Sequence, residues 1–369
     1  DGAQAEYEAA EMGLRLNARF IPHDEALEVA CSLQDTTGED RAVTLSFALG
    51  IDATGWRWWD DIRRSSVIAG EGLYVNGRNS ASYPLCCIED GRRALSLAIP
   101  LDRMVTHRLM YDADARELRL EFDLGLSAAT QKFPSRADVR FFILAPDPEW
   151  GFRAALSAYY RVHPEPFTTH ATTRGLWMTF HDLNDIPLAE DFHFGFHESG
   201  LLSPALNREL GVASLRYVLP GQIDVLLPFD APKDQSFDQV EAWVRENAPE
   251  RARDEWLERV QIMRDCALED EDRTLGYHAF YANWARGRLI YDCFVNSDPD
   301  LPVEHTHAAY MDAIWQKADG ELEAQGLDLD GVYLDNFQGG QPNFRREHFA
   351  SVDHPLTFRG NPPRPCTLA

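Results

Sequence analysis

The fold is decided by the stretch Gly331-Val332-Tyr333-Leu334-Asp335-Asn336-Phe337. Its first four residues predict a short buried strand, and the polar pair Asp335 and Asn336 follows directly. A predicted helix (308–325) precedes the strand, and a glycine-containing loop (339–343) follows it. In parallel α/β folds, and above all in (β/α) barrels, catalytic groups lie at the carboxyl ends of strands. Asp335 is therefore the first candidate catalytic residue, and an ordinary turn-forming aspartate is the alternative.

The length and charge of the chain limit the classes of protein to consider. With 369 residues, the chain is long enough for two domains. No run of apolar residues reaches the 18 that a membrane span requires. The net charge is 35 − 60 = −25, and such a field repels nucleic acid and anionic membranes. We therefore expect neither partner, while the oligomeric state and the cellular location stay open.

The first part of the chain predicts an antiparallel β-sandwich over residues 1–146. Between about residues 20 and 145, segments with alternating apolar and polar residues follow one another without a long helical period. Within them, three tryptophans in four residues (56–59) predict packing in the sandwich, with a sugar-stacking platform as the alternative. The six cysteines lack zinc-type spacing, and we expect most of them to be buried free thiols.

The alternating pattern of apolar and polar residues ends over residues 147–172. An amphipathic segment (152–162) predicts one helix, which must end before Pro164 and Pro166 because proline cannot continue it. We interpret this region as a linker that carries a short helix.

The rest of the chain, 173–369, alternates predicted strands and helices. This order indicates parallel pairing with right-handed crossovers, and hence a (β/α) barrel of the TIM type. Strands are expected near 175–180, 213–220, 277–282, 289–295 and 331–334, and helices over 237–247, with Ser236 as N-cap, and 252–268. A complete barrel takes roughly 250 residues, whereas 369 − 172 = 197 are present here. The prediction is therefore multidomain, β plus α/β, with an incomplete barrel that holds its first half.

The order of sandwich, linker helix ending near 159–167 and barrel resembles large bacterial glycoside hydrolases, which place an N-terminal sandwich before a (β/α)₈ catalytic domain. Gly331-Val332-Tyr333-Leu334-Asp335-Asn336 is similar to the strand-end aspartate motif of several such families. The resemblance implies that Asp335 is the nucleophile or a key carboxylate. It stays at the level of a superfamily and identifies no single family.

Glycoside hydrolysis ordinarily needs two carboxylates that flank one bond. Besides Asp335, the carboxylates near predicted strand ends are Glu198, Asp182, Asp185 and Asp292, and we select Glu198 and Asp292 as the catalytic candidates. Aromatic and polar residues near strand ends are the candidate substrate-binding residues. These are Trp177, His181, Asp182, Tyr217, Tyr281, Trp284 and Asn336.

The sequence predicts no metal and no cofactor. His193 and His197 are four residues apart, but they lack the His-Glu-x-x-His pattern of a zinc helix. The sequence also contains no phosphate-binding loop, nucleophile elbow or dinucleotide fingerprint. The leading hypothesis is a glycosidase that acts on a carbohydrate. The alternatives are a polysaccharide lyase and a non-catalytic carbohydrate-binding or surface-assembly protein.

Overall fold

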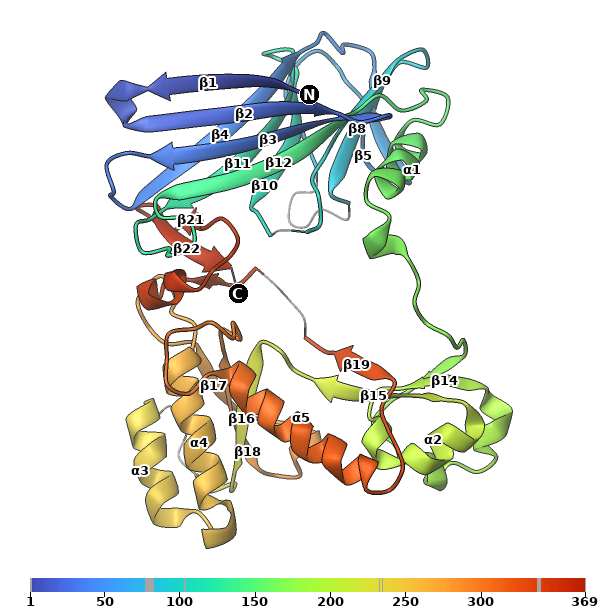
Figure 1. The fold of residues 1–369 in the computed structure, drawn as a ribbon, viewed down its shortest axis with the longest axis vertical. Coiled ribbons are helices and arrows are strands. Elements are labelled where there is room, and N and C mark those ends of the chain that lie inside the picture. Colours follow the sequence, from blue (N-terminus) through green and yellow to red (C-terminus); the bar gives the residue numbers. More distant parts are fainter. Residues whose placement is uncertain are drawn as a thin grey trace. The chain divides into compact units, whose positions relative to one another are not determined.

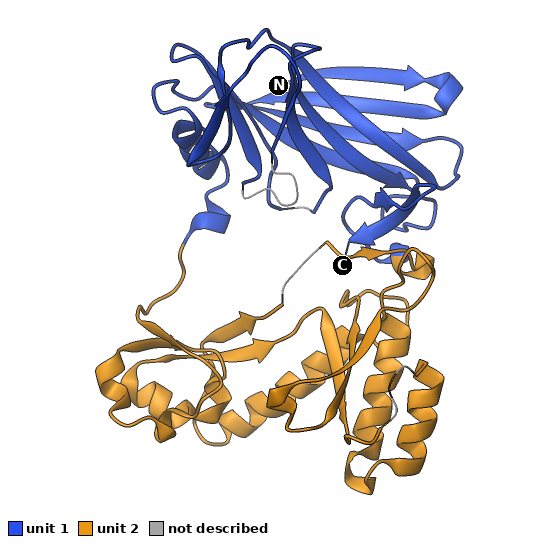
Figure 2. Ribbon diagram, turned by 180° about the vertical axis from the view of Figure 1, so that it is seen from behind, with its two compact units in different colours: residues 1–168, 349–368 blue, residues 169–348, 369 orange. Residues whose placement is uncertain are grey.

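The computed structural model describes residues 2–76, 83–102, 104–231, 233, 235–336 and 340–368. The chain divides into two compact units, shown in different colours in Figure 2. The first holds Asp1–Thr168 and Phe349–Leu368, and the second holds Thr169–His348. Among the described residues, no helix is both long and apolar enough to cross a membrane.

The first unit is built from two antiparallel sheets (Figure 1). The larger sheet has the order β1-β2-β3-β12-β9-β8-β5-β6, and the smaller has the order β4-β11-β10-β7. Their strands are β1 (Ala3–Ala9), β2 (Leu14–Pro22), β3 (Ala26–Asp35), β4 (Arg41–Gly50), β5 (Arg57–Asp61), β6 (Arg64–Val67), β7 (Leu73–Val75), β8 (Leu85–Glu89), β9 (Ala94–Ala98), β10 (His107–Asp112), β11 (Glu117–Leu126) and β12 (Arg136–Leu144). A later hairpin of β21 (Thr357–Arg359) and β22 (Arg364–Leu368) also belongs to this unit.

The core of the first unit lies between these sheets, as the alternating pattern predicts for a sandwich. In β11, Leu118, Leu120 and Phe122 are fully buried, and they meet Val29 and Phe141 of the larger sheet in one apolar cluster. The tryptophan cluster follows the packing interpretation, because Trp56 and Trp58 are 7% and 3% exposed in the same core. All six cysteines are buried free thiols, which confirms that prediction.

Helix α1 (Phe152–Val162) covers β8 and the end of the larger sheet. Its apolar stripe, including Phe152, Ala155 and Tyr159, is buried against Leu85 and Phe142. The Tyr159 hydroxyl donates to the Ile99 carbonyl at 2.7 Å, so this buried polar group is satisfied. The helix has the bounds that the amphipathic period predicts, and it ends just before Pro164.

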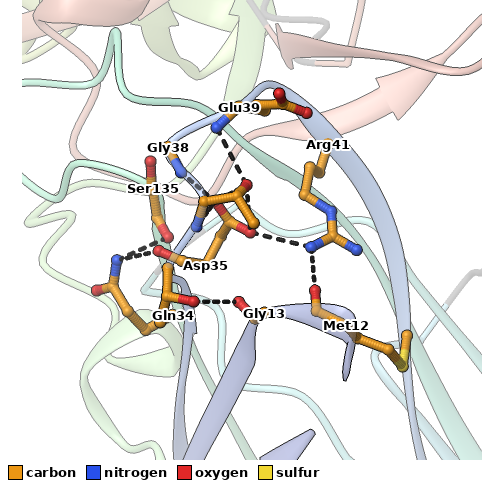
Figure 3. Close-up of polar contacts among 10 residues, drawn as sticks. Met12, Gly13, Gln34, Asp35, Gly38, Glu39, Arg41 and Ser135 are labelled. Atoms are coloured by element: carbon orange, nitrogen blue, oxygen red, sulfur yellow. Dashed lines mark hydrogen bonds and ion pairs between the residues drawn. The ribbon is translucent and has the colours of Figure 1, made fainter. Parts of the chain in front are cut away.

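A polar cluster around Asp35 fixes the turn between β3 and β4 (Figure 3). The buried Asp35 carboxylate accepts from the backbone N–H of Gly38 at 2.8 Å and from Arg41 at 3.0 Å. Burial would raise the pKa of Asp35, but hydrogen bonds from Thr37, Gly38 and Arg41 outweigh it and lower the pKa. Arg41 also donates to the Met12 carbonyl and so ties this turn to the β1–β2 connection. The cluster is a structural feature of the sandwich.

The second unit contains a four-stranded parallel sheet in the order β13-β14-β15-β19. Its strands are β13 (Leu176–Met178), β14 (Phe194–His197), β15 (Ala213–Val218) and β19 (Gly331–Leu334), with helices α2 (Pro204–Leu210) and α5 (His307–Glu323). The predicted strand at 331–334 is thus the fourth parallel strand. It is not buried as we expected, because Val332 and Leu334 are each 47% exposed. The sheet is open, however, and it does not form the closed arrangement of a TIM barrel.

A second, antiparallel sheet of this unit differs from the prediction. Strands β16 (Gln222–Leu227), β18 (Leu289–Phe294) and β17 (Tyr277–Tyr281) pair in that order. We expected β17 and β18 to be barrel strands, which is wrong because β16 turns back within four residues of β15 and pairs antiparallel with β18. Helices α3 (Phe237–Asn247) and α4 (Glu250–Cys266) pack on this sheet, and Ser236 forms the N-cap of α3 with a capping box.

Candidate functional site

The candidate site lies at the carboxyl ends of β15 and β19, which run side by side (Figure 1). The backbone N–H of Asp335 donates to the Val218 carbonyl at 2.9 Å and extends the pairing by one residue. Asn336 then has φ 49°, a left-handed conformation that asparagine tolerates better than most residues. This sharp turn places the Asp335 carboxylate at the end of the sheet.

Both carboxylate oxygens of Asp335 are held by hydrogen bonds. Oδ1 accepts from the backbone N–H of Asn336 at 2.8 Å, and Oδ2 accepts from the Tyr217 hydroxyl at 2.5 Å. Tyr217 lies in β15, directly opposite Tyr333 in the parallel register. Hydrogen bonds to an ionised acceptor are short and strong. Asp335 is therefore oriented by neighbours from two strands.

The pKa of Tyr217 is raised well above its ordinary value. Partial burial of the hydroxyl is the largest cause, followed by the hydrogen bond to Asp335 and by the negative charges of Asp335 and Glu198. The same two carboxylates raise the pKa of the Tyr333 hydroxyl, after desolvation. Tyr217 consequently remains a protonated donor at neutral pH, and both carboxylates lie within electrostatic reach of both tyrosines.

Glu198 follows β14 and is only 6% exposed. Its Oε2 accepts from the Trp177 indole N–H at 2.9 Å. The Trp177 ring meets the Tyr333 ring edge-on at a centroid distance of 4.6 Å, and Phe180 meets Tyr217 at the same distance. Trp177 is nevertheless 44% exposed. These aromatic rings form a partly open wall beside two carboxylates.

A second path of hydrogen bonds leads from Asn336 to Asp292. The Asn336 side-chain amide donates to Gln222 at 3.0 Å, and the Gln222 amide donates to Asp292 Oδ2 at 3.1 Å. Asp292 is 6% exposed, and burial raises its pKa to about 6. His278 and the Gln222 hydrogen bond oppose this shift, while Asp224 adds to it. Asp292 is thus a carboxyl group that holds its proton at mildly acidic pH.

A small cavity of about 140 Å³ adjoins this path. It is smaller than the roughly 300–1,000 Å³ of typical small-molecule pockets, so it accounts for one part of a binding site. Its lining residues are Gly221, Gln222, Leu268, Phe294, Val295, Asn336 and Gln341. Residues 337–339, which include the start of the predicted glycine-containing loop, lie outside the described residues.

The remaining predicted residues are placed differently. Asp182 caps a short 3₁₀ helix by accepting from the Asn184 backbone at 2.9 Å, and its neighbour His181 is exposed. Tyr281 and Trp284 lie at one end of the antiparallel sheet, and Gln222 lies at the other end. The reason is that β16 begins at Gln222 and β17 runs in the same direction, so that Tyr281 comes at the far end. The Tyr281 hydroxyl donates to a loop carbonyl there. The structure therefore groups Asp335, Asn336, Tyr217, Glu198, Trp177 and Asp292.

Sequence reasoning missed the parts of the site that connect these residues. Gln222 opens β16, whose alternation over residues 222–227 is the signal that could have identified the strand. Tyr333 and Phe180 were read only as parts of strands, although their rings complete the aromatic wall.

The described part of the chain holds no cluster of three or more histidine, cysteine or acidic side chains arranged to bind a metal. His197 is fully buried, with its Nδ1 3.1 Å from the Asn207 side-chain oxygen, while His193 is exposed. These two histidines do not converge on a common site.

No family model matches the chain, and no curated protein matches it. Among solved structures, the chain resembles a family 36 α-galactosidase from Geobacillus stearothermophilus, with a TM-score of 0.50 and 11% identity, over 90% of this chain and 48% of that one. An α-N-acetylgalactosaminidase from Bifidobacterium bifidum gives a TM-score of 0.44 and 10% identity, over 97% and 65% of the two chains. An α-galactosidase from Lactobacillus brevis gives 0.43 and 9%, over 86% and 45%.

At such low identity, the likeness to the α-galactosidase concerns the fold alone. The chain spans about half the length of the α-galactosidases that it resembles. Its class is therefore a mostly β protein with some helices, whose fold is like that of multidomain glycoside hydrolases.

Proposed function

We propose that this protein is a glycoside hydrolase that acts on O-glycosidic bonds, with Asp335 as the nucleophile. The observation that carries the proposal is a strand-end carboxylate with both oxygens held by donors, linked by hydrogen bonds to a second carboxyl group and bordered by exposed aromatic rings. The resemblance to an α-galactosidase supports the same class of reaction.

The roles follow from the environment of each group. Two uncharged hydrogen-bond donors orient the Asp335 carboxylate for attack on an anomeric carbon. Asp292, with a pKa of about 6, suits the group that protonates the leaving oxygen. Glu198, held by the Trp177 indole, is the alternative proton donor. Trp177 and Tyr333 offer ring faces for the apolar side of a sugar.

A lyase is a weaker interpretation for a physical reason. Lyases need a deprotonated base and cationic side chains for a uronate, whereas the raised pKa of Tyr217 keeps its hydroxyl protonated at neutral pH. The hydrogen-bond partners of the Asp335 side chain among the described residues are a tyrosine hydroxyl and a backbone amide, and neither carries positive charge. A non-catalytic carbohydrate-binding protein remains the alternative that experiment must separate.

The test is hydrolysis of a panel of 4-nitrophenyl glycosides, beginning with α-galactoside and α-N-acetylgalactosaminide. Asp335→Asn should lower kcat/KM by about 10³-fold or more, because the covalent step loses its nucleophile. With Asp335→Gly, added azide should restore turnover and give a glycosyl azide of inverted configuration. Hydrolysis that survives Asp335→Asn unchanged would refute the assignment, and binding of a glycoside without turnover would favour the non-catalytic alternative.

Leaving groups identify the proton donor. Loss of a general acid slows hydrolysis of poor leaving groups by about 10²–10⁴-fold and spares activated aryl glycosides. We expect this pattern for Asp292→Asn. The same pattern in Glu198→Gln, together with a uniform loss or none in Asp292→Asn, would move the role to Glu198.

A further inference from the structure

The first unit carries a groove that the candidate site does not use. It has a volume of about 650 Å³, within the roughly 300–1,000 Å³ typical of small-ligand sites. All of its lining residues belong to the first unit. We call it the Trp150 groove, and its principal residues are Asp24, Glu25, Asp147, Trp150, Arg153 and Arg161.

Trp150 is the apolar surface of this groove. Its side chain is 59% exposed, whereas Trp56 and Trp58 of the same unit are buried in the core. A single exposed tryptophan is unremarkable on a surface, but this one lines a cavity whose other walls combine charged side chains with the small apolar residues Ala145, Pro146, Ala154 and Ala158. An accessible indole face with polar neighbours matches the two-sided chemistry of a pyranose ring, which has C–H groups on its faces and hydroxyls at its edge.

The backbone around Trp150 is fixed before any ligand arrives. Its N–H donates to the Asp147 carbonyl at 3.3 Å, and the next N–H donates to the same carbonyl at 3.1 Å. The Trp150 carbonyl in turn accepts from the Arg153 N–H at 3.1 Å. A preorganised aromatic platform reduces the ordering cost of binding.

The polar walls provide donors and acceptors for hydroxyl groups. Arg153, Ser157 and Arg161 are four residues apart on α1, so their side chains follow one exposed stripe of the helix. Arg161 pairs with Glu25 at 2.5 Å and connects α1 to the β2–β3 turn. The net charge of the groove is about −1 at neutral pH, because it has three acidic and two basic side chains. These are Asp24, Glu25 and Asp147, and Arg153 and Arg161. This balance favours a neutral ligand over a sulfated or uronate one.

We propose that the Trp150 groove is an accessory binding site for a neutral pyranose unit of an oligo- or polysaccharide. The sugar ring stacks on Trp150, its hydroxyls donate to Asp24 or Asp147, and Arg153 donates to them. This site is independent of the carboxylates at β19, so it stands whether or not the chain hydrolyses a glycoside.

The experiment uses the full chain with Asp335→Asn, which prevents turnover without altering the groove. Affinity electrophoresis through galactomannan, xyloglucan, arabinoxylan and starch measures binding, and a sulfated carrageenan serves as the charged comparison. We expect retardation by at least one neutral polymer. Adding Trp150→Ala should weaken it about fivefold or more, as loss of a stacked ring does, and Trp150→Phe should restore part of it. Trp284→Ala, at a similarly exposed tryptophan of the second unit, is the matched control.

A second readout locates the bound sugar. Oxidation by N-bromosuccinimide, followed by peptide mass spectrometry, should show Trp150 protected by the retarding polymer. The proposal is overturned if no neutral polymer retards the chain, if Trp150→Ala and Trp284→Ala behave alike, or if Trp150 oxidises equally with and without the polymer. Failure of glycoside hydrolysis would leave all three results unaffected, so the two proposals fail separately.

Discussion

Asp292 offers the sharpest test, because its raised pKa requires that substitution alter stability and chemistry in opposite directions. Burial raises the pKa from 3.8 to about 6, a shift of 6 − 3.8 = 2.2 units. The folded state therefore binds this proton more tightly than the unfolded state does. Stability is highest below the unfolded pKa, falls as pH rises through the window from about 4 to 6, and stays constant above it.

The size of this penalty follows from the shift. At 1.36 kcal/mol per unit, ionising Asp292 costs the fold about 3 kcal/mol at pH 8. At pH 5 the energetic cost comes only from the pH interval between the unfolded-state pKa of 3.8 and pH 5, and it is about 1.6 kcal/mol. Asp292→Asn keeps an oxygen that can accept from Gln222 and carries no charge to desolvate. We expect the variant to be more stable by about 2–3 kcal/mol at pH 8, and by about half as much at pH 5.

The assay is urea unfolding monitored through hydrogen exchange in peptides from β16 and β18. The signal then comes from the sheet that holds Asp292. Asp224→Asn is a second test, since Asp224 lies opposite Asp292 in the sheet and its charge adds to the raised pKa; removing that charge should lower the pKa of Asp292. Equal destabilisation of Asp292→Asn at both pH values would refute the reasoning. So would a stability difference from wild type that does not change between pH 5 and pH 8.

Three further substitutions test the site and the fold. Tyr217→Phe removes the hydroxyl that orients Asp335. A half-buried hydrogen bond to a charged group is worth about 1–2 kcal/mol, so kcat/KM for glycoside hydrolysis should fall about tenfold. The circular dichroism spectrum should stay unchanged, and an unchanged rate would refute this role. Asp35→Asn should destabilise the sandwich to urea by about 2–3 kcal/mol at pH 7. The difference in stability between variant and wild type should shrink as pH falls below 4. The Asp35 carboxylate of the wild type then becomes protonated, as pH falls through its lowered pKa, and loses its ion pair with Arg41. A difference that does not depend on pH would contradict the ion-pair explanation. Ser236→Ala removes an N-cap and should lower the protection of α3 against hydrogen exchange by about 1 kcal/mol, with equal protection as the contrary outcome.

The features that the sequence predicts well are those whose cause is local. Helices 152–162 and 237–247 have the predicted bounds, because the apolar period lies within each segment and the prolines and the Ser236 cap lie next to it in the sequence. The strand before Asp335 is identifiable for the same reason, since a short apolar run ends abruptly in two polar residues. Asp335 as a strand-end carboxylate needed no knowledge of the rest of the chain.

The pairing of strands is where local information ends. β17 and β18 have the length and composition of barrel strands, and their antiparallel direction is set by β16, which reverses the chain just after β15. Sequence alone therefore placed Tyr281 and Trp284 at the wrong kind of sheet end. It also left Gln222 unnoticed, although this residue joins Asn336 to Asp292 through its side-chain amide. An amide that bridges two elements has no sequence signature, because its role consists of its two partners.

The two groups of tryptophans make the same point about surfaces. Trp56 and Trp58 are adjacent to charged residues in the sequence and yet are buried, whereas Trp150 and Trp177 are exposed. Which face of a strand or turn meets a core is decided by the neighbouring layer, so only the structure separates buried aromatics from exposed ones.

Asp292 shows why a candidate catalytic group can be easier to recognise by the energetic cost of its burial than by its sequence. It interrupts the apolar run Leu289–Phe294, in which the residues on both sides of it are buried. An aspartate there has to be either paired with a cation or held as the acid. Its side chain accepts from the neutral Gln222 amide, and His278, which lies opposite it in the sheet, offsets only part of the effect of burial. The same burial that destabilises the ionised form raises the proton affinity toward the range in which an acid is useful. If Asp292 is the proton donor, Asp292→Asn should gain folding stability and lose hydrolytic activity. Both changes then have one cause, the free-energy cost of desolvating the ionised carboxylate.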